Sequence, residues 1–349
     1  MLTADPQIEV IIPNWNGSAM LQHCLRSLAQ QTFRNFSITV VDNGSSDDTK
    51  EVLAQEFPAV KLISFDHNTG FSVAVNAGIS AAKSELLLLL NNDMEVTENC
   101  LEQLIAGALQ YPEYAFFALK MLSFSQRNVL DGAGDAVLRG GVGYRLGTLE
   151  YDTERYQHNR EVFGACAGAA LYRKSFFDIA GIFDADFFAY LEDVDLNIRA
   201  RRCGLRCMYL SNAVVYHIGS ATSGSKINPL TIRLSTRNNF NVLIKNYPLR
   251  FFIQFGPAIL TYQFFWFIFC CKKKMLSPWV KGCYEAMRNS AVFLKKRQEL
   301  LDGVEPQKSL KLTEQIKRAE KEAVISIISR RTQQGKSNGF LRLYLKLFF

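Results

Sequence analysis

The stretch that decides the fold is residues 85–93, which read ELLLLLNND. Five consecutive leucines suit a strand that is buried on both faces. Such strands are typical of a parallel sheet covered by helices on each side. The polar residues 91–93 then mark a turn. This segment therefore predicts a central parallel strand with polar side chains at its carboxyl end.

The sequence before this strand alternates apolar runs with amphipathic stretches. Strands are expected at residues 8–13, 36–41 and 60–65, and Leu21, Leu25 and Leu28 fall on one face of a first helix. Residues 72–82 predict a second helix. Strands that alternate with helices indicate right-handed βαβ units and a doubly wound α/β domain. Ligands of such sheets bind beyond the carboxyl ends of the strands, which here carry residues 13–16, 42–44 and 91–93.

The pattern is less regular after residue 120. Residues 125–165 are rich in Gly, Asp and Arg and predict irregular loops or a hairpin. Residues 169–173 predict a strand, and residues 207–217 predict one or two. The stretch 192–202, EDVDLNIRARR, predicts a helix with acids in its first turn and arginines in its last, as the helix dipole favours.

Composition narrows the class of protein. The 349 residues are 48% hydrophobic and 21% charged, which excludes a disordered chain, a collagen-like chain and a coiled-coil rod, and the length suggests about two domains. Residues 272–349 hold 18 Lys and Arg against 7 Asp and Glu, whereas the rest of the chain is mildly acidic. A basic tail indicates contact with a polyanion, either nucleic acid or an anionic membrane.

The cysteines and the first residues indicate the compartment. Eight cysteines occur without a CxxC pair, which predicts reduced thiols in the cytosol and argues against a structural zinc site. The start, MLTADPQIE, is polar and acidic, so a secretory signal is not expected.

Residues 251–271 form the most hydrophobic stretch, with two Gln and no charge between Arg250 and Lys272. The length would just span a bilayer, but Gly256 and Pro257 are expected to kink or split a helix. An interfacial helix with basic anchors and a buried core helix are the alternatives. Residues 342–349, RLYLKLFF, are basic and amphipathic and could touch the same surface.

Several motifs resemble one enzyme family in their order and spacing. They are IIPNWNG, VVDNGSSDDT, NTGFSVAVNAGI, LLLLLNNDMEV, the run from GAALYRKSFF to EDVDLNIRARRCG, and VVYHIGSATSG. The chain resembles the family-2 glycosyltransferases over residues 8–250, and within them the rhamnosyltransferase-like branch that builds bacterial surface polysaccharides. The resemblance implies a GT-A fold and an inverting transfer from a nucleotide-diphosphate sugar with Mg²⁺ or Mn²⁺.

The resemblance also implies roles for the acids. Asp93 would hold the divalent cation that bridges the diphosphate of the donor, and His217 would complete the metal shell. Asp193 would be the general base that takes the proton from the acceptor hydroxyl, with Glu192 beside it positioning the acceptor or tuning its neighbour. The alternatives are an ordinary turn at Asp93, a structural histidine, and two acids that merely cap the following helix, as expected of Asp195.

Further residues would bind the nucleotide-sugar. Asp42 would accept a hydrogen bond from the base, or else only form an Asx-turn, and Pro13 and Trp15 would wall the base. Gly70 would let the backbone approach the diphosphate. The remaining members of this group are Asn68, Asn76, Asn91 and Asn92. Asp131 and Gly134 are further candidates for the sugar pocket, and Arg237 and Asn238 for a phosphate of the acceptor.

The sequence thus predicts a GT-A domain at residues 1–245 and a basic, helical, membrane-associating region at 246–349. The expected partners are a sugar nucleotide such as a dTDP-rhamnose-like or UDP-sugar donor, a lipid-linked saccharide acceptor and an anionic membrane surface, without nucleic acid. The expected location is the cytoplasmic face of the cell membrane, peripheral or monotopic, with a single span as the alternative. Rival readings are a nucleotidyltransferase and a non-catalytic sugar-nucleotide-binding scaffold. A dinucleotide-binding oxidoreductase and an α/β-hydrolase are disfavoured, because their motifs are missing.

Overall fold

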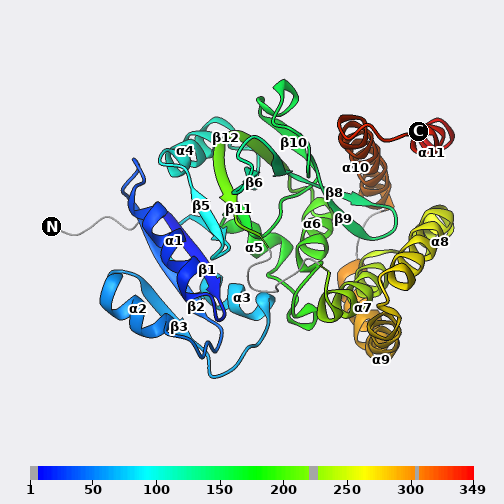
Figure 1. Ribbon diagram of the computed structural model, residues 1–349. Coiled ribbons are helices and arrows are strands. Elements are labelled where there is room, and N and C mark those ends of the chain that lie inside the picture. The colour runs from blue at the N-terminus through cyan, green and yellow to red at the C-terminus, as the bar shows by residue number, and fades with distance from the viewer. Residues whose placement is uncertain (1–6, 220–226, 303–305) are drawn as a thin grey trace.

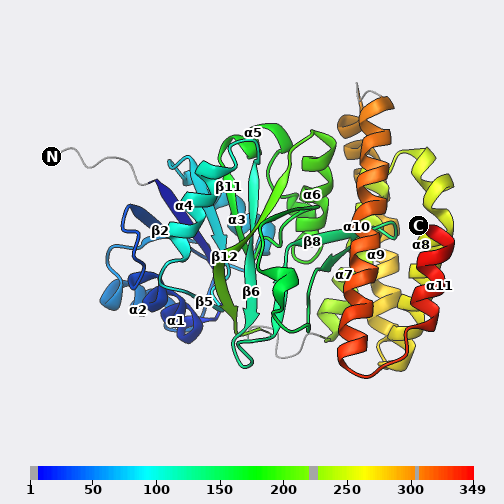
Figure 2. The same cartoon turned by 90° about the horizontal axis from the view of Figure 1, so that it is seen from above.

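The computed structural model describes residues 7–219, 227–302 and 306–349. An α/β body built on one mixed sheet occupies one side of the molecule, and the helices after residue 228 gather on the other side (Figures 1 and 2). The elements of the first half, in chain order, are β1 (Ile8–Asn14), α1 (Ser18–Ala29), β2 (Phe36–Asp42), α2 (Thr49–Glu56), β3 (Lys61–Ser64), α3 (Phe71–Ala81), β4 (Leu86–Leu90), β5 (Met94–Val96), α4 (Cys100–Gln110), β6 (Phe116–Ser123), β7 (Leu130–Ala133), β8 (Asp135–Leu138), β9 (Val142–Arg145), η1 (Glu154–Tyr156), β10 (Arg160–Val162) and β11 (Ala169–Arg173).

The second half is mostly helical. Its elements are α5 (Ser175–Ala180), η2 (Ala185–Phe187), α6 (Glu192–Arg202), β12 (Cys207–His217), α7 (Pro229–Asn246), α8 (Leu249–Lys272), α9 (Leu276–Leu301), α10 (Pro306–Gln333) and α11 (Gly339–Phe348). The strands and helices expected before residue 91 are present, with ends shifted by a few residues, and α6 has the predicted bounds. The segment 125–165 is more ordered than expected, since it holds four short strands.

The main sheet has the strand order β10-β12-β6-β11-β4-β1-β2-β3, with β5 beside β12 and β7 beside β6. Strands β3, β2, β1 and β4 are parallel, as are β6 and β12. Strand β11 is antiparallel to both of its neighbours, β4 and β6. The sheet is therefore parallel from β3 to β4, as the leucine run predicts for one side of β4, and mixed from β11 onward.

The leucines of β4 show why the run is continuous. Leu86, Leu88 and Leu90 belong to the core that contains α1 and α4, whereas Leu87 and Leu89 belong to the core on the other side, which contains α3. Successive side chains of a strand point to opposite faces, so a strand covered on both faces needs apolar residues at every position.

The C-terminal helices are part of this architecture. Arg139, next to β8, forms a buried ion pair with Glu320 of α10, and its guanidinium also donates to the hydroxyl of Tyr344 on α11. Ser326 of α10 accepts a hydrogen bond from the backbone of Gly147 and donates to the buried Glu150. The last helices therefore close the face of the α/β body that carries β8 and β9.

The apolar stretch was expected to be kinked or split at Gly256 and Pro257; α8 is one continuous helix with Pro257 inside it, so the split is wrong and the kink stays a prediction. Within the described residues it is the one helix that is long and apolar enough to cross a membrane, judged by length and composition alone. Most of its apolar stretch is half-buried or exposed, because only 17% of the most apolar 18-residue window is buried. This low burial disfavours the alternative of a core helix.

Candidate active site

The carboxyl ends of β1, β2 and β4 meet at one edge of the sheet, because these strands are parallel. At this edge the buried Asn14 donates a hydrogen bond to Thr49 Oγ1 (3.1 Å), and Asn92 donates to Asn14 Oδ1 (2.6 Å). A Cβ atom on Gly17 would lie 2.3 Å from Asn92 Nδ2, so only glycine fits there. The amide of Asn92 thus ties the strand ends together, and a contact of Asn92 with the donor stays a prediction.

The residues expected to hold the base lie on the same edge. Trp15 is 39% exposed and Pro13 is half-buried, so Trp15 is not a core aromatic. Asp42 is fully buried, and its carboxylate accepts hydrogen bonds from Ser45 N–H (3.2 Å) and the Ser64 hydroxyl (3.3 Å). The N–H of Ser45 lies three residues on, one further than in the Asx-turn expected as the alternative, and the contact of Asp42 with a nucleoside stays a prediction.

Residues 68–76 contact the loop that precedes α6. Gly70 has φ +90°, and a Cβ atom there would lie 2.6 Å from the carbonyl oxygen of Phe188. Asn68 Oδ1 accepts from Gly70 N–H (2.9 Å). The amide of Asn76 donates to the carbonyl of Phe183 (2.7 Å) and accepts from its N–H (3.0 Å). The close approach that requires glycine at position 70 is therefore to this loop, and the amide of Asn76 is occupied by backbone.

Asn91 lies on the other side of β4, against the turn before β11. Its N–H donates to the carbonyl of Gly168 (2.8 Å), and a Cβ atom on Gly168 would lie 2.8 Å from Asn91 Nδ2. This contact places Asn91 next to the loop that carries Cys166. Its predicted donor contact stays a prediction.

Asp93 and His217 lie together although 124 positions separate them in the chain. Strand β5, directly after Asp93, pairs with the end of β12, and His217 is opposite Met94. His217 Nε2 is 3.2 Å from Asp93 Oδ2, and His217 Nδ1 is 2.8 Å from Asp131 Oδ2. Burial alone would lower the pKa of His217, but the hydrogen bonds to Asp131 and Asp93 outweigh it and raise the pKa to about 9. Unless a cation takes the place of the proton on Nε2, both ring nitrogens therefore donate at neutral pH.

Asp131 also links His217 to a second cluster. The Arg145 guanidinium forms an ion pair with Asp131 and donates to Cys166 Sγ (3.1 Å). A Cβ atom on Gly132 would lie 2.3 Å from the Arg145 side chain, so glycine is required between β6 and this arginine. Asp131, a candidate for the sugar pocket, thus holds both a histidine and an arginine in place.

Asp193 and Glu192 begin α6, and the chain enters this helix through a strained turn. Phe188, Tyr190 and Leu191 all have positive φ (64°, 70° and 65°), which costs free energy for residues with a side chain. Asn238 of α7 holds the turn, since its amide donates to the carbonyls of Phe187, Ala189 and Tyr190. The turn that positions Glu192 and Asp193 is therefore held by a side chain of α7, outside their own helix.

The contacts of Arg237 and Asn238 differ from those expected from the sequence. We expected Arg237 and Asn238 to meet a phosphate of the acceptor. The structure instead uses Asn238, which is fully buried, and Arg237, which donates to the Phe187 carbonyl (2.6 Å), to support the turn before α6. The amide of Asn238 donates to backbone oxygens, and Arg237 Nε donates to Asn238 Oδ1 (2.8 Å).

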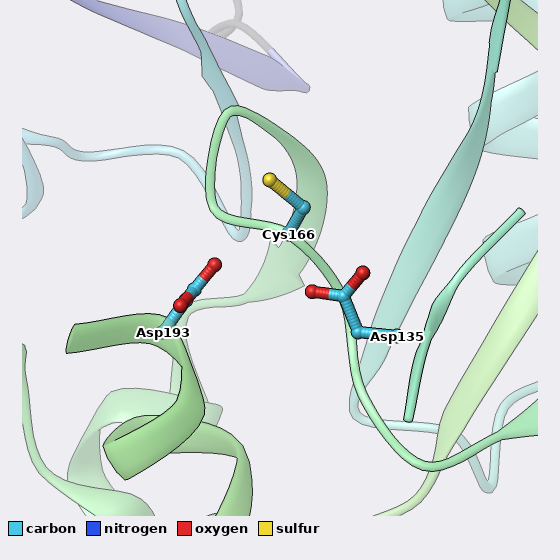
Figure 3. Close-up of side chains that lie close together, drawn as sticks. All are labelled: Asp135, Cys166 and Asp193. Atoms are coloured by element: carbon cyan, nitrogen blue, oxygen red, sulfur yellow. The ribbon is translucent and has the colours of Figure 1, made fainter. Parts of the chain in front are cut away.

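Asp135, Cys166 and Asp193 surround a common space (Figure 3). One ligand-type atom of each lies within 4.8 Å of the others. Asp135 Oδ1 is buried without a hydrogen-bond partner among the residues that the structure describes. Burial, and then the charge of Asp193, raise the pKa of Asp135 to about 8, and burial raises the pKa of Asp193. Burial and then Asp193 also raise the pKa of Glu192 to about 8.

Sequence reasoning missed Asp135, Arg145 and Cys166. They lie in the Gly-rich segment 125–165, which offers no periodicity that would bring them to α6. The backbone of Asp135 pairs with that of Gly164, and Asn197 of α6 bonds both the N–H and the carbonyl of Ala165. The repeated acids of DGAGD, beside so many glycines, were the available signal.

The expectation that Asp195 only caps α6 is wrong. Asp195 is fully buried and pairs with Arg199 Nε (2.9 Å) and Lys245 Nζ (2.9 Å), and it accepts from Asn246 (2.8 Å). Burial alone would raise the pKa of Asp195, but Lys245 and Arg199 hold it far below its usual value. Asp195 thus joins α6 to α7.

The comparisons with known proteins agree with this architecture. Residues 9–179 match the profile of the family described as glycosyl transferase family 2. The chain is 26% identical over 239 residues to the N-acetylglucosaminyl-diphospho-decaprenol L-rhamnosyltransferase of Mycobacterium tuberculosis, covering 62% of this chain and 78% of that protein. It is 27% identical over 226 residues to the O-antigen biosynthesis protein RfbC of Myxococcus xanthus, covering 62% of this chain and 18% of that protein.

Among solved structures, S. aureus TarS 1–349 in complex with UDP-GlcNAc superposes with a TM-score of 0.55 at 17% identity, covering 95% of this chain and 92% of that one. The likeness shows a shared GT-A glycosyltransferase fold with C-terminal helices. The family match and the curated relatives identify residues 9–179 as a glycosyl transferase family 2 domain, and the chain is similar to rhamnosyltransferases of that family.

Proposed function

We propose that this protein is an inverting glycosyltransferase of cell-surface polysaccharide synthesis. It moves a sugar from a dTDP-rhamnose-like or UDP-sugar donor to a hydroxyl of a lipid-linked saccharide at the cytoplasmic face of the cell membrane. The observation that carries the proposal is the convergence of Asp93 with His217, and of Asp193 with Asp135, near the carboxyl edge of the sheet. The name of the mycobacterial relative supports a lipid-linked acceptor.

The residues around Asp93 fit a divalent cation such as Mg²⁺ or Mn²⁺. Within the described chain Asp93 Oδ1 is buried and lacks a hydrogen-bond partner, so it is free to ligate. His217 receives its orientation from Asp131 through Nδ1, the arrangement that commonly fixes a metal-bound histidine. The cation would offset the negative charge that develops on the leaving diphosphate.

The cluster of Asp135, Cys166 and Asp193 fits such a cation less well. Burial raises the pKa of the Cys166 thiol to about 12, so it stays protonated at neutral pH and is a poor ligand. The Arg145 guanidinium beside it also repels a cation. We therefore assign Asp193 to proton transfer rather than to the metal.

Asp193 acts as the general base in this proposal. Its carboxylate takes the proton of the acceptor hydroxyl while that oxygen attacks the anomeric carbon opposite the leaving diphosphate, which inverts the configuration. Burial raises the pKa of Asp193, which makes the carboxylate a better proton acceptor than an exposed aspartate. Glu192 is buried beside it, so the charge of one acid affects the pKa of the other.

The division at residue 245 is retained as a functional proposal. Residues 1–245 supply the chemistry and 246–349 bring the enzyme to the membrane, although α10 also packs on the sheet side through Glu320. The basic tail is assigned to anionic lipid and not to nucleic acid, because the body before residue 272 is net acidic and would repel phosphates.

Calorimetric titration with UDP, dTDP, GDP and CDP tests the proposal, with Mn²⁺ or Mg²⁺ and then with chelator. We expect metal-dependent binding of one or two of them, weakened in D93A and unchanged in D178A, which removes an exposed acid on α5. Binding without transfer to any lipid-linked acceptor would favour the scaffold alternative. Absence of binding by the folded protein would refute the proposal.

A further inference from the structure

Helix α8 exposes a continuous apolar stripe. Leu249, Ile253, Leu260 and Phe264 recur at intervals of four or seven residues, and their side chains are 69%, 78%, 71% and 60% exposed. This spacing places them on one side of the helix. Single exposed apolar residues are ordinary, but a contiguous stripe of large ones marks an interaction surface.

Helix α11 extends this stripe. Phe340 and Leu343, three positions apart, are 63% and 53% exposed, and the ring of Phe340 contacts that of Phe265 on α8 (6.3 Å between centroids). Figure 2 shows the two helices side by side at the edge of the molecule farthest from the N-terminus. We call this surface the α8–α11 face; it consists of Leu249, Ile253, Leu260, Phe264, Phe265, Phe340 and Leu343.

The charged residues of α8, of the turn that follows it and of α11 are all positive. Lys272, Lys273 and Lys274 are exposed at the end of α8, and Arg342 and Lys346 are exposed on α11. The sequence has no Asp or Glu from 249 to 284 or from 333 to 349. An apolar stripe bordered by cations and free of acids complements the interface of an anionic bilayer. A protein partner with both acidic and basic residues would not explain why only cations cluster on these helices.

The other side of α8 is attached to the enzyme along its length. Trp266 Nε1 donates to Thr236 Oγ1 of α7 (2.8 Å), and Gln263 Nε2 donates to Asn239 Oδ1 (2.5 Å). Tyr262 packs against Gly140, where an added Cβ atom would lie 2.8 Å from it. A membrane-spanning α8 would have to break these contacts or carry α7 into the hydrocarbon.

Helix α7 cannot follow α8 into a bilayer core. It contains Arg233, Arg237 and Lys245, and Lys245 is bound to Asp184 and Asp195 of the catalytic body. Charged side chains deep in a bilayer are costly, and their ion pairs here belong to the water-soluble body. The length of α8 is therefore no argument for a span.

We propose that α8 lies in the plane of the membrane, with the α8–α11 face inserted into one leaflet of anionic lipid and the chain on one side of the bilayer throughout. This deepens the proposed function, on which it rests for the lipid-linked acceptor. It names the anchor and the geometry by which the enzyme reaches that acceptor.

Flotation of the full chain with vesicles of phosphatidylcholine, alone or mixed with phosphatidylglycerol, tests the surface. We expect binding to the anionic vesicles, reduced about tenfold or more in I253S/L260S/F264S, because each side chain loses its transfer from water. K272Q/K273Q/K274Q should lose the preference for anionic vesicles and its salt dependence. The matched control, L109S/I179S/I182S, removes three exposed apolar side chains from the catalytic body and should bind like the wild type.

Two native thiols distinguish an in-plane helix from a span. Cys203 follows α6 and Cys271 lies near the end of α8, and both are exposed. In variants that keep one of the two, an impermeant maleimide added to sealed inside-out membrane vesicles should label both. Labelling of Cys271 only from the opposite side would overturn the in-plane arrangement.

Two other outcomes would contradict the proposed membrane anchor. If the stripe variant floats like the wild type, the α8–α11 face is not the anchor. If the wild type does not float but the stripe variant changes from dimer to monomer in solution, the occupant is a second copy of the chain and the lipid proposal is wrong. Transfer to a water-soluble acceptor analogue, measured in parallel, reports the proposed function independently of any lipid.

Discussion

The first turn of α6 carries acidic residues on two sides, and the pKa of the acids is lowered on one side and raised on the other. Asp195 faces α7 and is fully satisfied by Arg199, Lys245 and Asn246. Asp193 and Glu192 face the sheet edge, where Asp135 adds a third acid and burial raises their pKa. One turn of helix therefore holds a carboxylate that stabilises the fold, the proposed general base Asp193, and Glu192 beside it. The difference lies in what packs against them.

The largest effect is expected from breaking the reactive side. D193N removes the proton acceptor but keeps the shape, so kcat should fall by about 10²–10⁴-fold while UDP or dTDP binding is retained. Steady-state transfer and nucleotide titration measure the two quantities. D178N on exposed α5 is the control, and retention of more than about a tenth of the activity by D193N would place the base elsewhere.

Breaking the satisfied side should affect stability instead of chemistry. D195A leaves Lys245 and Arg199 buried without their shared carboxylate, which typically costs about 3–5 kcal/mol in the free energy of unfolding. Since the pKa of Asp195 is lowered in the folded state, its contribution is present at neutral pH and is lost as the pH falls below the usual range of an aspartate. Urea denaturation at pH 7 and pH 3 tests both statements; an unchanged midpoint at pH 7 would contradict them.

A third variant sharpens the role of Asp131 between the two clusters. D131N weakens the acceptor that orients His217, so the apparent affinity for Mn²⁺ in nucleotide binding should fall by about 10–100-fold. D152N, which disturbs the ion pair with Lys120 away from the site, controls for the loss of an acid. If both variants bind Mn²⁺ equally well, His217 is not a ligand.

The smallest effect concerns the coupling between neighbours. E192Q fixes the neutral form that Glu192 keeps below about pH 8, so its kcat/KM profile should match the wild type on the acidic limb and depart from it only above about pH 8, where Glu192 ionises beside Asp193. The raised pKa of Glu192 also affects stability, because the unfolded chain loses this proton near the ordinary value of 4.5 whereas the folded chain keeps it up to about 8. The free energy of unfolding therefore falls as the pH rises from about 4.5 to about 8. Thermal unfolding of E192Q should depend less on pH in this range, and an unchanged profile in both assays would show that the two acids are independent.

The parts of the fold that depend on local pattern could be predicted from the sequence. The leucines of β4 indicate burial on both faces, and α6 shows its bounds by acids at one end and arginines at the other. The direction of β11 could not be predicted, because a short apolar run reads alike in parallel and antiparallel pairing. The continuous α8 was missed because Pro257 is a poor helix former on local grounds.

The candidate site also has a part that could be predicted from the sequence and a part that could not. Asp93, His217, Asp193 and Glu192 stand in motifs and were predicted, and the structure brings Asp93 and His217 together. Asp135 and Arg145 were missed because only the folding of the segment 125–165 brings them beside Asp193 and Cys166. Asp195 was misread because its partner Lys245 lies 50 residues further along the chain. Motifs locate chemistry, whereas long-range pairing decides which of several acids performs it.

The contacts of α10 have a consequence for how the protein is made. Arg139 and Glu150 are buried, and their partners Glu320 and Ser326 are 181 and 176 residues away. Domains begin to fold while the ribosome is still adding residues, at about 5–20 residues per second. A nascent chain that has completed its sheet must therefore keep Arg139 without Glu320, and Glu150 without Ser326, until α10 emerges. Nearly the whole chain must be translated before this face of the enzyme can close.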